Sequence, residues 1–337
     1  SLSLITKNNF MNYKYFVGID VSKKTLDYSI LAEGEEILHI QLKNSIEGLE
    51  QFLKKLSEVC EKDSFEDVLF CMEHTGIYCE HIFTLLDMYD INLWVESSLR
   101  IKKTMGMTRG KNDRIDAKRI ALFSYRYQDK IRLWTPERSI IKRLKHLLTF
   151  RTRTIETIKL LKAPLKELKE FLSDEEYTKL SNLHINTLNA LGVDLKGINK
   201  EIDILIKEDI RLNYLFSIVS SVKNIGPVSA VLIIATTNEF LSLNEGKKYA
   251  CYAGVVPFQH QSGSSIMGKT RVSHIANKTV KTMLHMAALS SISRPGEFKD
   301  YFDRKVEEGK NKMSTINAIR NKLVLRVFAC VRDGKLY

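Results

Sequence analysis

The chain has 337 residues, a length typical of two domains of about 150 residues each, and it can bury a core without disulfide bonds. Hydrophobic residues make up 44% and charged residues 27%, a balance that excludes an intrinsically disordered protein. No run approaches the roughly 18 apolar residues of a membrane span. Lys and Arg (52) outnumber Asp and Glu (40), and the net charge of +12 favours a polyanionic partner, nucleic acid first and an anionic membrane surface second.

The cysteines are few, scattered and without a Cys-x-x-Cys pair, so we expect reduced thiols in a cytosolic protein and no zinc site. They are Cys60, Cys71, Cys79, Cys251 and Cys330. The first residues also lack the apolar stretch of a signal peptide, which agrees with a cytoplasmic location. No helix or strand is predicted for residues 1–10.

The first third of the chain predicts a mixed α/β domain. Its short β-branched and aromatic runs predict strands at 14–21, 26–32, 37–42, 67–72 and 91–95. Apolar periodicity predicts helices at 45–59 and 78–88 and another that begins near Asn112, after a basic, glycine-containing segment at 100–111. Three consecutive strands suggest a meander, and the later alternation suggests parallel pairing in which the first and fourth strands are neighbours.

Residues 137–216 form a pattern rich in Leu, Ile and Lys that predicts two long helices and is compatible with a coiled-coil hairpin. We expect Pro164 and the Leu191–Gly192 pair to interrupt these helices. Nine Lys/Arg and a single acid lie from residue 138 to residue 166. A helix with this charge is able to track a nucleic-acid backbone, with Arg143, Arg151 and Arg153 as contacts, or it presents a solvated face; the sequence leaves both open.

Residues 217–337 predict a second, mainly helical unit, with helices near 277–293 and 312–331. Its Ile225-Gly-Pro-Val228 segment resembles the tight turn of a helix-hairpin-helix, whose backbone amides can meet a phosphate. A simple connection between two helices explains the same residues equally well.

Four acids occupy places where they can converge. Asp20 ends the first predicted strand, Glu73 ends the fourth, and Asp113 and Asp116 share one face at the start of a helix. Four carboxylates suit two Mg²⁺ or Mn²⁺ ions, which hold the attacking and leaving oxygens of a phosphate displacement. Each acid alone is also a common turn former or a partner of the helix dipole.

A basic segment adjoins these acids and contains Lys102, Lys103, Arg109 and Lys111. A carboxylate cluster repels a polyanion unless a metal ion reverses the local charge. The combination therefore favours nuclease or transposase chemistry over simple binding.

A Gly/Ser-rich loop at 253–270 carries a candidate nucleophile. Ser262, Ser264 and Ser265 lie between glycines, and Lys269 and Arg271 follow. A serine among cations is able to attack a phosphorus atom. The same residues are compatible with a solvated hairpin or with a nest of amides that binds phosphate.

In this order, the motifs resemble a DEDD-type transposase of the insertion sequence 110 family, including its 1111 subgroup, over nearly the whole chain. They are Val17-Gly-Ile-Asp-Val-Ser-Lys-Lys24, Met72-Glu-His-Thr-Gly-Ile-Tyr78, Lys111-Asn-Asp-Arg-Ile-Asp-Ala-Lys118, Ile225-Gly-Pro-Val-Ser-Ala230, Tyr252-Ala-Gly254, Pro257, Gln261-Ser-Gly263 and Gly268-Lys269. The family's frequent Ser-Lys-x-Gly continuation is replaced here by Ser273-His-Ile-Ala-Asn277.

The resemblance implies three regions. They are a RuvC-like, ribonuclease-H-type metal-binding domain at 11–136, a helical linker at 137–216 and a transposase domain with the serine loop at 217–337. It implies that Asp20, Glu73, Asp113 and Asp116 bind Mg²⁺ or Mn²⁺ and that Ser262 forms a phosphoserine link to DNA, with Ser264 and Ser265 as neighbours. No other cofactor is expected.

The resemblance also implies partners. These are DNA, a structured non-coding bridge RNA that pairs with target and donor DNA, and further copies of the chain in dimers that join into tetramers. The acidic site of one subunit would then meet the serine of another. We expect no membrane association and a location at the bacterial or archaeal nucleoid.

Three other functions stay open on the sequence. The first is a DNA invertase of the same family, which flips a fixed segment. The second is a metal-dependent junction nuclease that uses water as the nucleophile. The third is a nucleic-acid-binding protein whose acidic site is inactive, against which the four intact acids argue.

Overall fold

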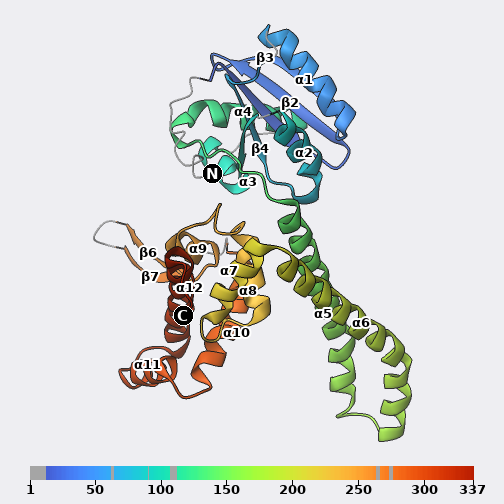
Figure 1. Ribbon diagram of the computed structural model, residues 1–337, viewed down its shortest axis with the longest axis vertical. Coiled ribbons are helices and arrows are strands. Elements are labelled where there is room, and N and C mark those ends of the chain that lie inside the picture. Colours follow the sequence, from blue (N-terminus) through green and yellow to red (C-terminus); the bar gives the residue numbers. More distant parts are fainter. Residues whose placement is uncertain (1–12, 62–63, 90, 107–111, 263–265, 273–275) are drawn as a thin grey trace. The chain divides into compact units, whose positions relative to one another are not determined.

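The computed structural model describes residues 13–337 except 62–63, 90, 107–111, 263–265 and 273–275 (Figure 1). The chain divides into two compact units, residues 1–136 and residues 137–337. Within the described ranges, no helix combines the length and the apolar character needed to cross a membrane.

The first unit is built on a five-stranded sheet of order β3-β2-β1-β4-β5 (Figure 1). Its strands are β1 (Tyr15–Val21), β2 (Thr25–Ala32), β3 (Glu35–Lys43), β4 (Val68–Glu73) and β5 (Asn92–Glu96). The first three form an antiparallel meander, and β4 runs parallel to both β1 and β5. The predicted mixed α/β fold, with its first and fourth strands as neighbours, is confirmed.

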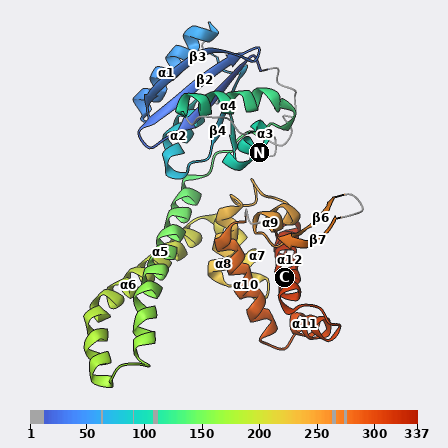
Figure 2. The same ribbon diagram turned by 180° about the vertical axis from the view of Figure 1, so that it is seen from behind.

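Helices cover both faces of this sheet, as Figures 1 and 2 show. They are α1 (Ile46–Cys60), α2 (Glu80–Met88), α3 (Ser98–Met105) and α4 (Asp113–Arg126), with short 3₁₀ turns at Gly76–Cys79 and Gln128–Lys130. Strand residues alternate between two cores: Val17 and Ile19 pack with α1 and α2, whereas Phe16 packs with α3 and α4.

The basic segment at 100–111, for which the sequence predicted no helix, begins within a helix. This helix, α3, covers residues 98–105. Ser97 caps this helix by accepting a hydrogen bond from the Arg100 amide, and Ile101 anchors it in the core. The helix ends at Gly106, whose φ is +72°.

The second unit begins with two long helices, α5 (Ser139–Leu168) and α6 (Asp174–Glu208), which lie side by side. The predicted interruptions are wrong, since Pro164 and Gly192 both lie inside helices. A glycine costs a helix only about 1 kcal/mol, and Pro164 falls close to the end of α5, so packing between the two helices outweighs both. Whether the pair forms a coiled coil stays a prediction.

The rest of this unit is mainly helical, as expected. Its elements are α7 (Ile210–Ser221), α8 (Pro227–Thr236), α9 (Gly246–Tyr252), β6 (Pro257–Ser262), β7 (Ile266–Val272), α10 (Lys278–Ile292), α11 (Glu297–Glu307) and α12 (Lys312–Asp333). The core gathers around the buried face of α12, with Ile319, Leu323 and Val327 at its centre. The boundary predicted at 216/217 falls within α7 and stays a prediction.

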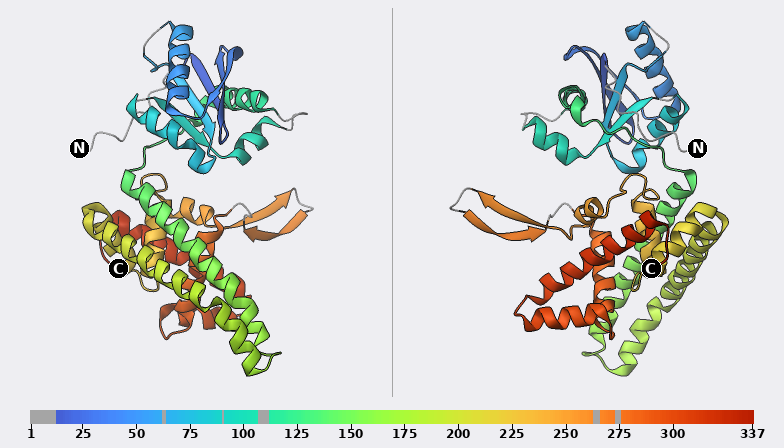
Figure 3. Two further views of the ribbon diagram at one scale, coloured as in Figure 1. Left: turned by 90° about the vertical axis from the view of Figure 1, so that its right-hand side faces the viewer. Right: turned by 60° about the vertical axis from the view of Figure 1, so that its left-hand side comes forward.

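The segment predicted as a Gly/Ser-rich loop contains an antiparallel hairpin, β6–β7, which projects from the helices of its unit (Figure 3). The Ile225–Val228 segment connects α7 to α8, and Pro227 is the first residue of α8, where its missing N–H costs nothing.

Candidate active site

The site in the first unit depends on a close approach of α4 to β1 at Gly18. A Cβ atom added there would lie 2.1 Å from the carbonyl oxygen of Ala117 and 2.3 Å from the amide nitrogen of Ala121. Any other residue at this position would collide with the helix backbone. Glycine therefore allows α4 to lie directly on the sheet.

The direction of α4 places its first turn near the end of β1. Ala117 and Ala121 lie over Gly18, and the Tyr125 ring meets the Phe16 ring at 5.2 Å between centroids. The start of α4 therefore lies over the end of β1 that carries Asp20.

Asp113 and Asp116 occupy that first turn of α4. Asn112 begins the helix by accepting a hydrogen bond from the Arg114 amide. Asp116 forms an ion pair with the Arg119 guanidinium at 3.7 Å.

A row of carboxylates crosses the sheet at the same level. Asp20 of β1 is directly opposite Asp27 of β2, and Glu73 of β4 is directly opposite Glu96 of β5. The last β1–β4 pair is Ile19 with Met72, so Asp20 and Glu73 come next on adjacent strands. Asp27 and Glu96 are acids of this row that the sequence prediction did not include.

Acids of this row and of α4 act on Asp20. Its side chain is partly buried, and burial together with the negative charges of Asp116, Asp113, Glu73 and Asp27 raises its pKa to about 6. The structure therefore brings the other three predicted acids close enough to Asp20 for their charges to act on it.

The two additional acids already have partners. Asp27 is buried and accepts hydrogen bonds from Gln41 (2.9 Å) and His39 (3.2 Å). Glu96 accepts from Arg100 (2.6 Å) and from the Ser97 amide (2.9 Å). These contacts fix Asp27 and Glu96 in place and balance part of their charge.

The donor set of this row suits a divalent hard cation, because it consists of carboxylate oxygens. The mutual repulsion expressed in the pKa of Asp20 is the kind that a bound cation relieves. As they stand, no three carboxylate, imidazole or thiol groups among the described side chains are close enough together to hold an ion.

The predicted nucleic-acid contacts have different surroundings. Lys102 and Lys103 are exposed in the last turn of α3, and Arg153 is exposed on α5. Arg143 pairs with Glu201 at 3.1 Å and Arg151 donates to Asn199 at 2.9 Å, so both join α5 to α6. Arg109 and Lys111 lie outside the described residues.

The predicted nucleophile lies in the second unit. Ser262 is the last residue of β6, and its backbone is opposite Ile266 of β7. Lys269 and Arg271 belong to β7, whereas Ser264 and Ser265 lie outside the described residues.

The base of this hairpin is tied to two helices. Asn317 of α12 donates a hydrogen bond to the Val255 carbonyl at 2.7 Å, two residues before β6 begins. Asn277, the cap of α10, donates to the Tyr252 hydroxyl at 2.7 Å. The hairpin therefore starts from a fixed base.

Two transposase family models match the chain. A DEDD model for IS110, described as Transposase, matches residues 17–171, which include the four predicted acids. A second, described as Transposase IS116/IS110/IS902 family, matches residues 217–303, which include Ser262. Together they cover well over half of the chain.

Known proteins resemble it along most or part of its length. The chain is 24% identical to the pilin gene-inverting proteins of Moraxella lacunata and Moraxella bovis over 326 residues, 96% of this chain and 97% of each relative. It is 25% identical to the Insertion element IS116 uncharacterized 44.8 kDa protein of Streptomyces clavuligerus over 164 residues, 49% of this chain and 40% of that protein.

Proposed function

Because the chain belongs to the IS116/IS110/IS902 family of transposases, an enzyme family that acts on DNA, we propose that it cuts and rejoins DNA through Ser262 with the help of four carboxylates. The observation that carries the proposal is the packing of α4 on Gly18, which sets Asp113 and Asp116 beside the row that contains Asp20 and Glu73. The roles of these five residues are part of the proposal.

The acids have a binding role. Asp20 and Glu73, on adjacent strands, and Asp113 and Asp116, on the helix above them, would hold Mg²⁺ or Mn²⁺. When bound, such ions neutralise charge on the phosphate and hold its attacking and leaving oxygens. Arg100 and Gln41 keep Glu96 and Asp27 fixed at the two ends of the row.

Ser262 has the nucleophilic role. Its Oγ forms a bond to phosphorus while the bond from phosphorus to the leaving deoxyribose oxygen breaks, and the hydroxyl proton passes to that oxygen. In the second step, a deoxyribose hydroxyl of the new strand attacks the phosphoserine and releases the serine. Each step exchanges one phosphate ester for another, so rejoining needs no ATP.

The proposal includes a bridge RNA as the source of sequence choice. The net charge of +12 and the exposed cations of α3 and α5, such as Lys102, Lys103 and Arg153, support binding of a second polyanion beside DNA. Base pairing by the RNA would then select target and donor.

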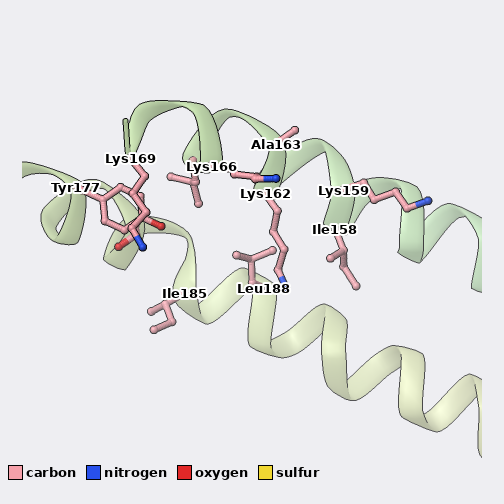
Figure 4. Close-up of a pocket in the computed structure, with 11 residues that line it drawn as sticks. Ile158, Lys159, Lys162, Ala163, Lys166, Lys169, Tyr177, Ile185 and Leu188 are labelled. Carbon is pink, nitrogen blue, oxygen red and sulfur yellow. The ribbon is translucent and has the colours of Figure 1, made fainter. Parts of the chain in front are cut away.

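The proposal also includes association of two copies through the α5–α6 pair. A groove of about 620 Å³ lies between the helices, with Lys159, Lys162 and Lys166 on its α5 side (Figure 4). Leu160 and Leu183 are 73% and 76% exposed on the same helices. Such unpartnered apolar side chains are typical of an interface.

The charges favour a second copy of the α5–α6 helix pair as the partner that fills this groove. The first turn of α6 is acidic, with Asp174, Glu175 and Glu176, and it complements the lysines of α5. Leu160 and Leu183 lie outside the lining of the groove, and the proposed contact extends over them. Such pairing agrees with an acidic site and a serine that come from different subunits.

A DNA invertase is the second candidate, and one observation favours it. The relatives matched along almost their full length are pilin gene-inverting proteins. Inversion and transposition use the same cutting and joining steps, so the chemistry proposed for Ser262 applies to both. The arrangement of the DNA sites distinguishes them.

Strand exchange between two DNA sites, in the presence of the element's RNA and Mg²⁺, tests the proposal. Asp20→Asn and Asp116→Asn should abolish exchange, whereas Asp129→Asn, an exposed acid of the same unit, should leave it unchanged. Full exchange by Asp20→Asn would contradict the acidic site. Cleavage that yields only free ends, with Ser262→Ala as active as the wild type, would identify a nuclease that uses water.

A further inference from the structure

Arg320 of α12 is a buried cation near the surface of the second unit. The residue is 6% exposed, and its Nη2 donates a hydrogen bond to Nδ1 of His285 on α10 at 2.5 Å. Its Nε is buried without a hydrogen-bond partner. Within the described part of the chain, one neutral acceptor is thus the only hydrogen-bond partner of this guanidinium.

Within the second unit, no carboxylate compensates this charge. All Asp and Glu residues of the second unit lie among the described residues, and none of them forms an ion pair with Arg320. By contrast, Arg326 and Arg332 of the same helix pair with Glu297 and Asp333. A buried charge without a counterion is costly, which indicates that the site receives an anion from elsewhere.

The surroundings of Arg320 are basic, and one of them, His285, is partly exposed. His285 is only partly buried, and its pKa is lowered by burial and by the Arg320 charge, so its Nδ1 stays free to accept. Lys281 lies one turn before His285 on α10, and Lys278 precedes it by a further three residues. An anion that approaches α10 therefore meets lysines before it reaches the guanidinium.

The site adjoins the base of the serine hairpin. Asn317 lies three residues before Arg320 on α12 and holds the Val255 carbonyl. DNA or RNA that passes the hairpin along this side comes within reach of α10 and α12.

We propose that Arg320, with His285 and Lys281, is a binding site for a backbone phosphate of nucleic acid beside the serine hairpin. The phosphate supplies the missing counterion, and the guanidinium donates to two of its oxygens. The inference rests on the proposed function only in that the protein must bind DNA or RNA. It adds a binding site that neither Ser262 nor the acidic row requires.

The most direct test supplies a carboxylate in place of the phosphate. His285→Glu would pair with Arg320 and compete with nucleic acid, while Met286→Glu adds the same charge to α10 at a neighbouring, 60% exposed position. Affinities for a DNA duplex and for a single-stranded RNA are measured over a range of salt concentrations, with both variants and the wild type. Thermal unfolding of each protein is measured in parallel.

We expect His285→Glu to weaken binding at least tenfold more than Met286→Glu and to lower the salt slope by about one phosphate, roughly 0.9 for duplex DNA or 0.7 for a single strand. Its melting temperature should rise, because Arg320 gains a counterion. If the salt slope falls for the DNA duplex, the phosphate belongs to DNA, and if it falls for the single-stranded RNA, the phosphate belongs to RNA. Arg320→Met should lose the same slope, and Arg332→Met should not.

Equal affinities and slopes for the two glutamate variants in both arms would overturn the inference and would point to a carboxylate of another protein as the counterion. A wild type that binds neither nucleic acid would overturn the proposed function, and this inference with it. If Arg320→Met does not fold, the comparison of His285→Glu with Met286→Glu still tests the inference.

Discussion

Gly18 of β1 lies so close to Ala117 of α4 that a methyl group on Gly18 would be 2.1 Å from the Ala117 carbonyl oxygen. This contact joins the strand that carries Asp20 to the helix that carries Asp113 and Asp116. The distance between the sheet acids and the helix acids is therefore set by one residue without a side chain.

Gly18→Ala should push α4 from the sheet. The obstacle is backbone, which cannot rotate away, so we expect a loss of about 2–3 kcal/mol in the free energy of unfolding and a weakened affinity for Mn²⁺. Urea unfolding and Mn²⁺ titration measure the two effects. In Gly192→Ala the added methyl meets nothing within 4 Å, and that helix should gain up to about 1 kcal/mol.

A Gly18→Ala protein with wild-type stability and Mn²⁺ affinity would show that α4 is free to shift without consequence. The acids of the helix and of the sheet would then not depend on this contact for their arrangement.

Asp20 should make the metal-free protein less stable as the pH rises. Its pKa of about 6 in the folded state exceeds the value of about 3.9 in an unfolded chain, so the folded state holds the proton more tightly. Stability is then full below about pH 4 and falls as the pH rises through 6. Because the side chain is partly exposed, we expect a loss of about 1–2 kcal/mol rather than the full shift.

Urea unfolding in EDTA at pH 4.5 and pH 7.5 measures this effect. Asp20→Asn should remove most of the difference and be more stable than the wild type at pH 7.5. Identical pH profiles for the two proteins would mean that burial and the neighbouring carboxylates do not raise the pKa of Asp20.

Arg138 should be essential for the stability of the second unit. Its guanidinium donates to Asp209 at 2.8 and 2.9 Å and to Glu239 at 2.6 and 2.8 Å, and the Glu239 side chain is fully buried. Arg138→Gln leaves Glu239 with Arg211, at 3.1 Å, as its remaining cation, so we expect a loss of about 2–4 kcal/mol at pH 7. Arg143→Gln, which breaks the exposed pair with Glu201, should cost less than about 1 kcal/mol.

The Arg138 contribution should also depend on pH. Arg138 lowers the pKa of Asp209 to about 2, below its value in the unfolded chain. The stability gained from the ionised Asp209 beside Arg138 is present above about pH 4 and is lost as the pH falls through 2. Unfolding curves of the two variants at pH 7 and pH 3 would contradict the account if Arg138→Gln and Arg143→Gln behaved alike.

Association through α5 and α6 should depend on their exposed leucines. We expect Leu160→Ser with Leu183→Ser to shift the protein from dimer to monomer in light scattering, because both side chains would be buried between the copies. Ile210→Ser, which removes a 91% exposed apolar side chain outside these helices, should leave the mass unchanged. A double variant that keeps the wild-type mass would place the interface elsewhere.

Much of the first unit could be predicted from sequence because its signals are local. Short β-branched and aromatic runs predicted the five strands, and acids at strand and helix ends predicted a cluster around Asp20. The sequence did not predict that α5 and α6 continue through Pro164 and Gly192, because packing between the two helices decides this. The sequence analysis missed Asp27 because its position opposite Asp20 follows from the register of β1 and β2. The short turn at Ser22–Thr25, which sets this register, was the one sequence feature that could have indicated it.

Arg320 was missed for a different reason. Nothing in its local sequence distinguishes it from the neighbouring arginines of α12, and only the tertiary structure shows which of them has a carboxylate partner. Charge compensation is a property of contacts between distant segments, so sequence patterns do not report it.

The central claim is that Ser262 becomes covalently linked to DNA in a step that needs the acidic row. The most direct measurement is the denaturant-stable protein–DNA adduct formed with the element's ends, its RNA and Mg²⁺, mapped by peptide mass spectrometry. The account predicts an adduct on the peptide that contains Ser262, absent from Ser262→Ala and from Asp20→Asn. An adduct that persists in Ser262→Ala, or strand exchange by the wild type with no adduct at all, would contradict it.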